Sequence, residues 1–130
     1  MPLSLGLRGR AETSVTEQNT AASVGSGSLS VFATPMMIAL MENAATAAVD
    51  GFLEEGQSSV GTHMDVSHDA ATPVGMKVWA EAELTGIEGR ALTFSVAAFD
   101  ETGPIGKGVH TRFVIQAEKF MVKAKGKVGK

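Results

Sequence analysis

The stretch TPMMIALMENAATAAVDGFL, residues 34–53, predicts the one long helix of the chain and thereby decides the fold. Thr34 is a good N-cap, because its hydroxyl can accept a hydrogen bond from the first turn. Pro35 suits the first helical position, where its missing N–H costs nothing. Residues 36–49 are rich in Met, Leu and Ala, which are strong helix formers. We therefore predict a helix from about Thr34 to Leu53.

This predicted helix is apolar on nearly every side. Met37, Met41 and Ala45 recur at helical spacing, and Ile38 and Leu40 add apolar side chains between them. A helix with so little polar surface is buried on most of its sides. Its many alanines would allow it to lie very close to a sheet.

The rest of the chain predicts strands. Residues 57–68 are rich in Ser, Val and Thr, and apolar residues alternate through 76–86, 91–99 and 105–117. Short segments that contain Gly, Pro or Asp separate these strands, and such short connections imply an antiparallel sheet. A weaker alternation over residues 7–16 predicts an edge strand.

One buried helix followed by a run of strands is an α+β pattern. A single long helix wrapped by an antiparallel sheet is the hotdog arrangement, which is the fold we predict. Neither an internal repeat nor a long linker is visible, so we expect a single domain over residues 1–130. We expect a flexible turn at residues 25–28 and a flexible basic tail over about residues 121–130.

Composition excludes several classes of function. The hydrophobic fraction of 44% is high for a small monomer, so we expect a homodimer that covers part of this surface. A net charge of −3 gives no overall attraction to nucleic acid. We expect no membrane span and no secretory signal, because no apolar run is long enough. The chain has no cysteine, which excludes a disulfide framework and a thiol nucleophile and fits a cytoplasmic protein.

Glu42 is a candidate site residue because it lies inside the most apolar helix. A buried carboxylate is costly unless it is paired or protonated, and in a cleft it is suited to acid–base work. The alternative is that Glu42 occupies the one wet stripe of the helix. Thr34 lies eight residues earlier on the same face, roughly 12 Å away along the axis, so the two side chains cannot touch. Thr34 has its own alternative role as a helix cap.

Histidine and arginine supply further candidates. His68 ends a predicted strand, where catalytic residues commonly lie, although an exposed loop histidine is the alternative. His63 and His110 are weaker candidates, because neither has an acidic neighbour in sequence, and the three histidines lack the spacing of a metal site. Arg112 shares a strand face with His110, so it could bind a phosphate or a carboxylate, or form a surface salt bridge.

Gly106 and Gly108 lie within the sequence IGKG, residues 105–108. This segment is not a phosphate-binding loop, because it lacks both the full spacing and a following helix. We interpret it as a β-bulge or a close approach of two backbones.

Four pieces of the chain resemble one branch of a known family. They are GSGSLSVFATPMMIALME (residues 25–42), SVGTHMDVSH (59–68), ATPVG (71–75) and GKGVHTR (106–112). In combination they resemble the fluoroacetyl-CoA thioesterase-like branch of the hotdog thioesterases. The resemblance extends over most of the chain, roughly residues 15–120.

The resemblance implies a dimer whose two sheets join edge to edge, with active sites near the subunit interface. By position, it implies catalytic roles for Thr34, Glu42 and His68. It also implies that Gly61 and Arg112 contact the substrate. It implies neither a metal nor a cofactor, because coenzyme A is part of the substrate.

The function expected on this basis is hydrolysis of a short or medium acyl-CoA to the free acid and coenzyme A. We expect His68 to be the general acid/base, hydrogen-bonded to Thr34 or Glu42, with Glu42 as a base or nucleophile. Backbone N–H groups near Gly61 or the helix start would hold the oxyanion. The alternatives are a non-catalytic acyl-CoA-binding module and a hotdog dehydratase or hydratase.

The segment before the helix bears on the acyl group. In the family's namesake, fluoroacetyl specificity is associated with a phenylalanine-bearing lid in this segment. Here residues 22–29 read ASVGSGSL, and the first aromatic residue is Phe32. We therefore expect a more general short or medium acyl-CoA as the substrate.

Overall fold

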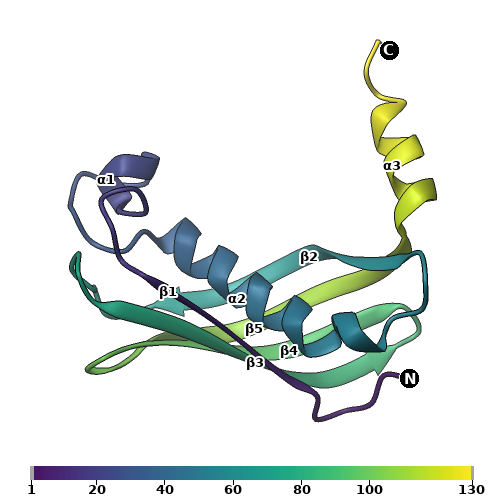
Figure 1. Ribbon diagram of the computed structural model, residues 1–130, viewed down its shortest axis with the longest axis horizontal. Helices are drawn as coiled ribbons and strands as arrows, with labels where there is room; N and C mark the ends of the chain where they lie inside the picture. Colours follow the sequence, from purple (N-terminus) through teal and green to yellow (C-terminus); the bar gives the residue numbers. More distant parts are fainter. Residues whose placement is uncertain (1, 130) are drawn as a thin grey trace.

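The computed structural model describes residues 2–129 and shows one curved antiparallel sheet wrapped around a long helix (Figure 1). The α+β hotdog prediction is therefore confirmed. No helix in this part of the chain is long and apolar enough to cross a membrane. The elements in chain order are β1 (Arg8–Ser14), α1 (Ala21–Val24), α2 (Thr34–Val49), η1 (Asp50–Phe52), β2 (Gln57–His68), β3 (Lys77–Glu88), β4 (Ala91–Asp100), β5 (Gly103–Gln116) and α3 (Ala117–Lys125).

The long helix α2 differs from its prediction at both ends. It ends at Val49, and the short 3₁₀ helix η1 follows up to Phe52, so Leu53 lies outside it. The N-cap is Ala33, which makes no side-chain capping bond, and Thr34 is the first helical residue. The predicted capping role of Thr34 is thus wrong, because its side chain bonds to another element.

The core lies between α2 and the sheet. Gly9 of β1 passes directly beneath the helix, and a Cβ added there would overlap the backbone of Ala44 and Ala48. The small side chains of α2 and β1 therefore allow the close approach that the alanine content predicted. The buried residues of α2 are Met37, Leu40, Met41, Ala44, Ala45, Ala48 and Val49.

The alternation predicted for β3 and β4 is confirmed. Their inward-facing residues are buried beneath α2, namely Val78, Ala80, Ala82, Leu84, Leu92, Phe94, Val96 and Ala98. Strand β5 reverses the usual pattern over its second half. There His110 and Arg112 are buried, whereas Val109 and Phe113 on the opposite face are exposed. Burial of these two polar residues marks β5 as part of a site.

The two edges of the sheet are β1 and β2, because the strand order is β1-β3-β4-β5-β2. Strand β1 carries charged side chains, and Arg8 and Arg10 form ion pairs with neighbouring glutamates. Strand β2 is 12 residues long and contains neither Lys nor Pro. Lysine, proline and shortness are the features that normally prevent an edge strand from pairing with another chain. Strand β1 also lacks lysine and proline, but it is shorter, at seven residues, and its charged side chains protect it.

Two expected flexible segments have regular structure in part. The turn at residues 25–28 follows the short helix α1, and Gly25 caps this helix in the left-handed conformation, with φ of 80°. In the expected tail, residues 121–125 belong to α3, which rises away from the sheet (Figure 1). Lys130, the last residue of that tail, lies outside the described residues.

The contact between Gly9 and α2 generates a stability prediction. Gly9→Ala is expected to lower the free energy of unfolding by about 2–3 kcal/mol or more, because the helix backbone cannot move aside cheaply. The matched control is Gly51→Ala, where an added Cβ meets nothing within 4 Å. That variant should change the free energy by less than about 0.5 kcal/mol. Urea unfolding followed by Trp79 fluorescence measures both, and equal midpoints for the two variants would contradict the packing described here.

Candidate active site

The start of α2 and the end of β2 meet through one hydrogen bond. Thr34 Oγ1 lies 2.7 Å from Nδ1 of His68, although the two residues are 34 positions apart in sequence. Both side chains line a hollow of about 230 Å³ that also includes Asp69. The predicted bond from His68 to Thr34 is therefore present, and Thr34 is a partner of the histidine rather than a helix cap.

The other ring nitrogen of His68 has no partner. Nε2 is buried and makes no hydrogen bond among the described residues. Burial lowers the pKa of His68, and the backbone of Ala70 and the charge of Asp69 oppose this shift only in part. The neutral imidazole is thus favoured near pH 7. A buried polar atom without a partner calls for an explanation, and a catalytic role is one such explanation.

A buried pair holds the loop that follows His68. Thr72 Oγ1 donates to Asp100 Oδ2 at 2.7 Å, and the carbonyl of Thr72 accepts from the backbone N–H of Phe32 at 2.8 Å. The backbone N–H of Asp69 donates to the carbonyl of Ile105 at 2.6 Å. These bonds connect the segment after β2 to β4, to β5 and to the segment that leads into α2. The relative position of His68 and Thr34 is fixed as a result.

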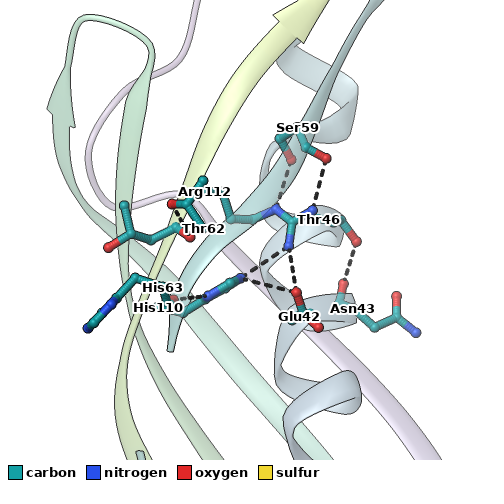
Figure 2. Close-up of polar contacts among 9 residues, drawn as sticks. Glu42, Asn43, Thr46, Ser59, Thr62, His63, His110 and Arg112 are labelled. Atoms are coloured by element: carbon teal, nitrogen blue, oxygen red, sulfur yellow. Dashed lines mark hydrogen bonds and ion pairs between the residues drawn. The ribbon is translucent and has the colours of Figure 1, made fainter. Parts of the chain in front are cut away.

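Glu42 belongs to a second polar group, shown in Figure 2. Its Oε2 accepts from Arg112 Nη1 at 3.4 Å and lies 4.0 Å from Nε2 of His110. The Glu42 side chain is 41% exposed, whereas that of Arg112 is only 7% exposed. Glu42 is thus neither buried alone nor on a fully wet stripe. Its carboxylate covers a buried guanidinium at the rim of a hollow of about 240 Å³.

Arg112 is held rigidly inside the protein. Its Nε donates to Ser59 Oγ at 2.8 Å, and its Nη2 donates to the carbonyl of Ser59 at 2.9 Å. Burial lowers the pKa of Arg112, and the charge of Glu42 opposes that shift. The alternative of a surface salt bridge is wrong, because Arg112 is buried. The carboxylate that it binds here belongs to the same chain.

Gly61 allows the carboxylate to lie directly against β2. A Cβ at this position would collide with Oε2 of Glu42 and would crowd the His110 ring. The pairing of β2 with β5 also shifts register between Gly61 and His63. The glycine and the irregular strand therefore make room for the polar group.

The IGKG segment shows the predicted close approach. A Cβ on Gly106 would meet the backbone of Ser67 and the sulfur of Met37, and one on Gly108 would meet the backbone of β2. The pairing of β4 with β5 shifts register beside Gly106.

His110 is part of the site, although it has no acidic neighbour in sequence. Its ring is 1% exposed, and Nδ1 lies 2.8 Å from the carbonyl of His63. A carbonyl only accepts, so Nδ1 carries the proton and the lone pair is on Nε2. Nε2 therefore accepts from Arg112 Nη1 at 3.1 Å. The signal was the placement of His110 and Arg112 on one strand face, which was recognised for Arg112 only and which brings Glu42 close to a histidine that is remote in sequence.

The five predicted residues form two groups within one chain. Thr34 and His68 line one hollow, and Glu42 and Gly61 line another beside the buried Arg112. No hydrogen bond or ion pair joins the two groups among residues 2–129. Three catalytic side chains converging in one pocket are therefore not found within a single chain.

Comparison with known proteins places this geometry in a family. Residues 15–118 match the family model described as fluoroacetyl-CoA-specific thioesterase. The chain is 47% identical to the fluoroacetyl-CoA thioesterase of Streptantibioticus cattleyicolor over 97 residues, which are 75% of this chain and 70% of the relative.

Solved structures agree with this assignment. The fluoroacetyl-CoA thioesterase FlK superposes with a TM-score of 0.91 at 37% identity, covering 98% of this chain and 99% of that one. A thioesterase superfamily member from Thermus thermophilus has a TM-score of 0.89 at 29% identity, covering 97% and 93%. The fold, the quoted motifs and these matches agree, and the chain belongs to the fluoroacetyl-CoA-specific thioesterase family of acyl-CoA thioester hydrolases.

Proposed function

We propose that this chain hydrolyses a short acyl-CoA in the cytoplasm, without a metal or a cofactor, using Thr34, His68 and Glu42. The observation that carries the proposal is the 2.7 Å bond between Thr34 and His68, which leaves Nε2 of the histidine without a partner. A short acyl group is supported by the name of the relatives and by a variant of FlK that was solved with acetyl-CoA. Phe32, the first aromatic residue after the lid segment, is buried in the core and supplies no lid.

The proposed chemistry uses His68 first as a base and then as an acid. In this proposal the protonated Nδ1 donates to Thr34 Oγ1 and the lone pair is on Nε2, while burial lowers the pKa of His68 and so favours the neutral ring. Nε2 takes a proton from water as the water oxygen bonds to the thioester carbonyl carbon. When the carbon–sulfur bond breaks, His68 returns this proton to the sulfur of coenzyme A. Glu42 orients the water and takes the proton of the carboxylic acid that is released.

One backbone N–H group at the start of α2 is available for the oxyanion. Pro35 has no N–H, and the N–H groups of Met36 and Met37 donate to the carbonyl of Ala33, so the backbone N–H of Thr34 is the donor that we assign to this role. Donors fixed in this way stabilise the negative charge that develops on the carbonyl oxygen, and such groups are a large part of catalysis in acyl transfer.

The enzyme is proposed to be a homodimer that pairs through β2. This strand is a long free edge without lysine or proline, and an edge of this kind is a template for pairing with another chain. A second copy is the occupant that the family resemblance implies. Antiparallel pairing around a two-fold axis near Met64 and Asp65 would place His68 opposite Gly61 of the partner subunit. Each complete site would then combine the Thr34–His68 pair of one subunit with the Glu42 group of the other.

Loss of either acid–base residue should nearly abolish activity. Glu42→Gln and His68→Ala are each expected to lower kcat/KM for acetyl-CoA by about a hundredfold or more, because each removes a proton-transfer group. Glu55→Gln, on the exposed turn before β2, is the control and should retain the wild-type rate. Release of coenzyme A is followed with a thiol-reactive dye. Unchanged rates in both site variants would remove this mechanism, and tight acyl-CoA binding without turnover in the wild type would indicate a binding module.

A mixed dimer tests the shared site. Glu42→Ala and His68→Ala chains are each inactive as pure dimers, but co-refolding them should restore about a quarter of the wild-type activity, because half of the dimers are mixed and each of these has one intact site. The sedimentation mass should be twice the 13.5 kDa of the chain. A site confined to one chain predicts no recovery in the mixture, and a mass of 13.5 kDa contradicts the dimer.

His110 is predicted to make stability depend on pH. Its pKa is lowered from 6.5, mainly by burial and further by the charge of Arg112, while the bond to His63 and the charge of Glu42 oppose the shift. His110 therefore binds a proton more readily in the unfolded chain than in the folded one. The contribution of His110 to stability is complete above about pH 6.5 and decreases as pH falls below that value. His110→Gln should flatten the dependence of unfolding midpoint on pH below about 6.5. The same slope in the variant and the wild type would contradict this assignment.

A further inference from the structure

A third hollow, of about 370 Å³, lies at the base of α3 and has no part in the chemistry above. Three cationic side chains line it: Arg90 from the turn between β3 and β4, and Lys119 and Lys123 from α3. Lys119 and Lys123 are four residues apart, so they lie on one side of the helix. Neither aspartate nor glutamate lines this hollow among the described residues.

The cations of this hollow are available to a ligand. None of Arg90, Lys119 and Lys123 forms an ion pair within the part of the chain that the structure describes. The net charge of the chain is −3, so this cluster of positive charge is opposite in sign to the protein as a whole. Cations without carboxylate partners around a concave surface fit an anion, and a phosphate accepts several hydrogen bonds from them.

The hollow also has an apolar side. Phe120 is 40% exposed, and the buried Val114 also lines the hollow. An exposed aromatic ring can stack on a nucleobase, and arginine and lysine beside it can bind the attached phosphates. The combination favours a nucleotide over inorganic phosphate alone, because phosphate makes no use of an exposed ring.

The hollow lies beyond the Glu42 group along the same strands. Val114 is two residues after Arg112 on the same face of β5, roughly 7 Å along the strand. Gln57, another residue of its wall, is at the start of the strand that contains Gly61. We propose that Arg90, Lys119, Lys123 and Phe120 bind the adenosine phosphate end of coenzyme A. This proposal rests on the proposed function and adds the recognition of the carrier to it.

Two substrates separate this inference from the proposed function. Acetyl-CoA carries the nucleotide, and acetyl-N-acetylcysteamine has the same thioester without it. The triple variant Arg90→Gln, Lys119→Gln, Lys123→Gln is expected to raise KM for acetyl-CoA about tenfold with little change in kcat, because it removes binding that is equal in ground and transition states. Its kcat/KM for the truncated substrate should match that of the wild type. Phe120→Ala should raise KM for acetyl-CoA only.

The matched control removes the same charge elsewhere. Lys107→Gln, Lys125→Gln, Lys127→Gln alters three exposed lysines that do not line the hollow, and it should leave KM for acetyl-CoA within about twofold of the wild-type value. Free adenosine bisphosphate should compete with acetyl-CoA in the wild type, and much less in the lining variant. An unchanged KM in the lining variant overturns this inference and leaves the thioesterase intact. A wild type that hydrolyses neither substrate overturns the proposed function.

An anionic lipid surface is the other partner that basic residues beside exposed apolar ones could meet. Sedimentation with phosphatidylserine-containing vesicles tests it directly. Vesicle binding that the lining variant loses, together with an unchanged KM for acetyl-CoA, would assign the three cations to lipid headgroups and overturn the nucleotide site. An absence of vesicle binding with the expected rise in KM supports it.

Discussion

The close packing of α2 on the sheet is the constraint on which the remaining structure depends. Ala44 and Ala48 lie directly over Gly9 of β1, so no side chain separates the helix from the strand. At the opposite edge of the sheet, polar side chains of α2 reach strand β2 directly. Thr34 bonds to His68, and Glu42 lies against the backbone at Gly61. Glycine at positions 9 and 61 thus has one purpose, which is to remove a Cβ where α2 approaches a strand.

The same geometry explains why the two polar groups stay apart. Eight helical residues from Thr34 to Glu42 span roughly 12 Å, whereas seven strand residues from Gly61 to His68 span roughly 23 Å. The contact of Thr34 with His68 and the contact of Glu42 with Gly61 are therefore well separated along both elements. In the proposed dimer, one chain would therefore supply half of each of two sites, and the free edge of β2 is the place where a second chain would bring the complementary halves together.

Burial of His110 and Arg112 is costly, and the surrounding bonds offset much of that cost. Ser59 accepts two hydrogen bonds from the guanidinium, the neutral His110 accepts a third, and Glu42 supplies the opposite charge. Removing one partner would leave a buried donor unpaired. This is more destabilising than replacing the whole group with apolar side chains of similar size. Such a group gives Glu42 a fixed position at the rim of a hollow.

The sequence predicted the fold well because periodicity records which side chains face the core. The strands, the buried faces of β3 and β4 and the central helix all follow from it. The role of Thr34 and the importance of His110 did not follow, because each depends on a partner that is remote in sequence. Local rules favoured a cap for Thr34, and no acidic neighbour marked His110. The helix α3 was also missed, since its lysines and the glycines that follow it resemble those of a flexible tail.

The two proposals together assign a direction to the substrate. The basic hollow lies where β2 begins and β5 ends, on the side of the Glu42 group. The Thr34–His68 pair lies where β2 ends. A nucleotide bound by one subunit would extend its thioester past Glu42 of that subunit toward His68 of the partner subunit. Binding of the carrier and proton transfer would then belong to different chains. Dimerisation through the unprotected edge of β2 would therefore be a requirement of the chemistry.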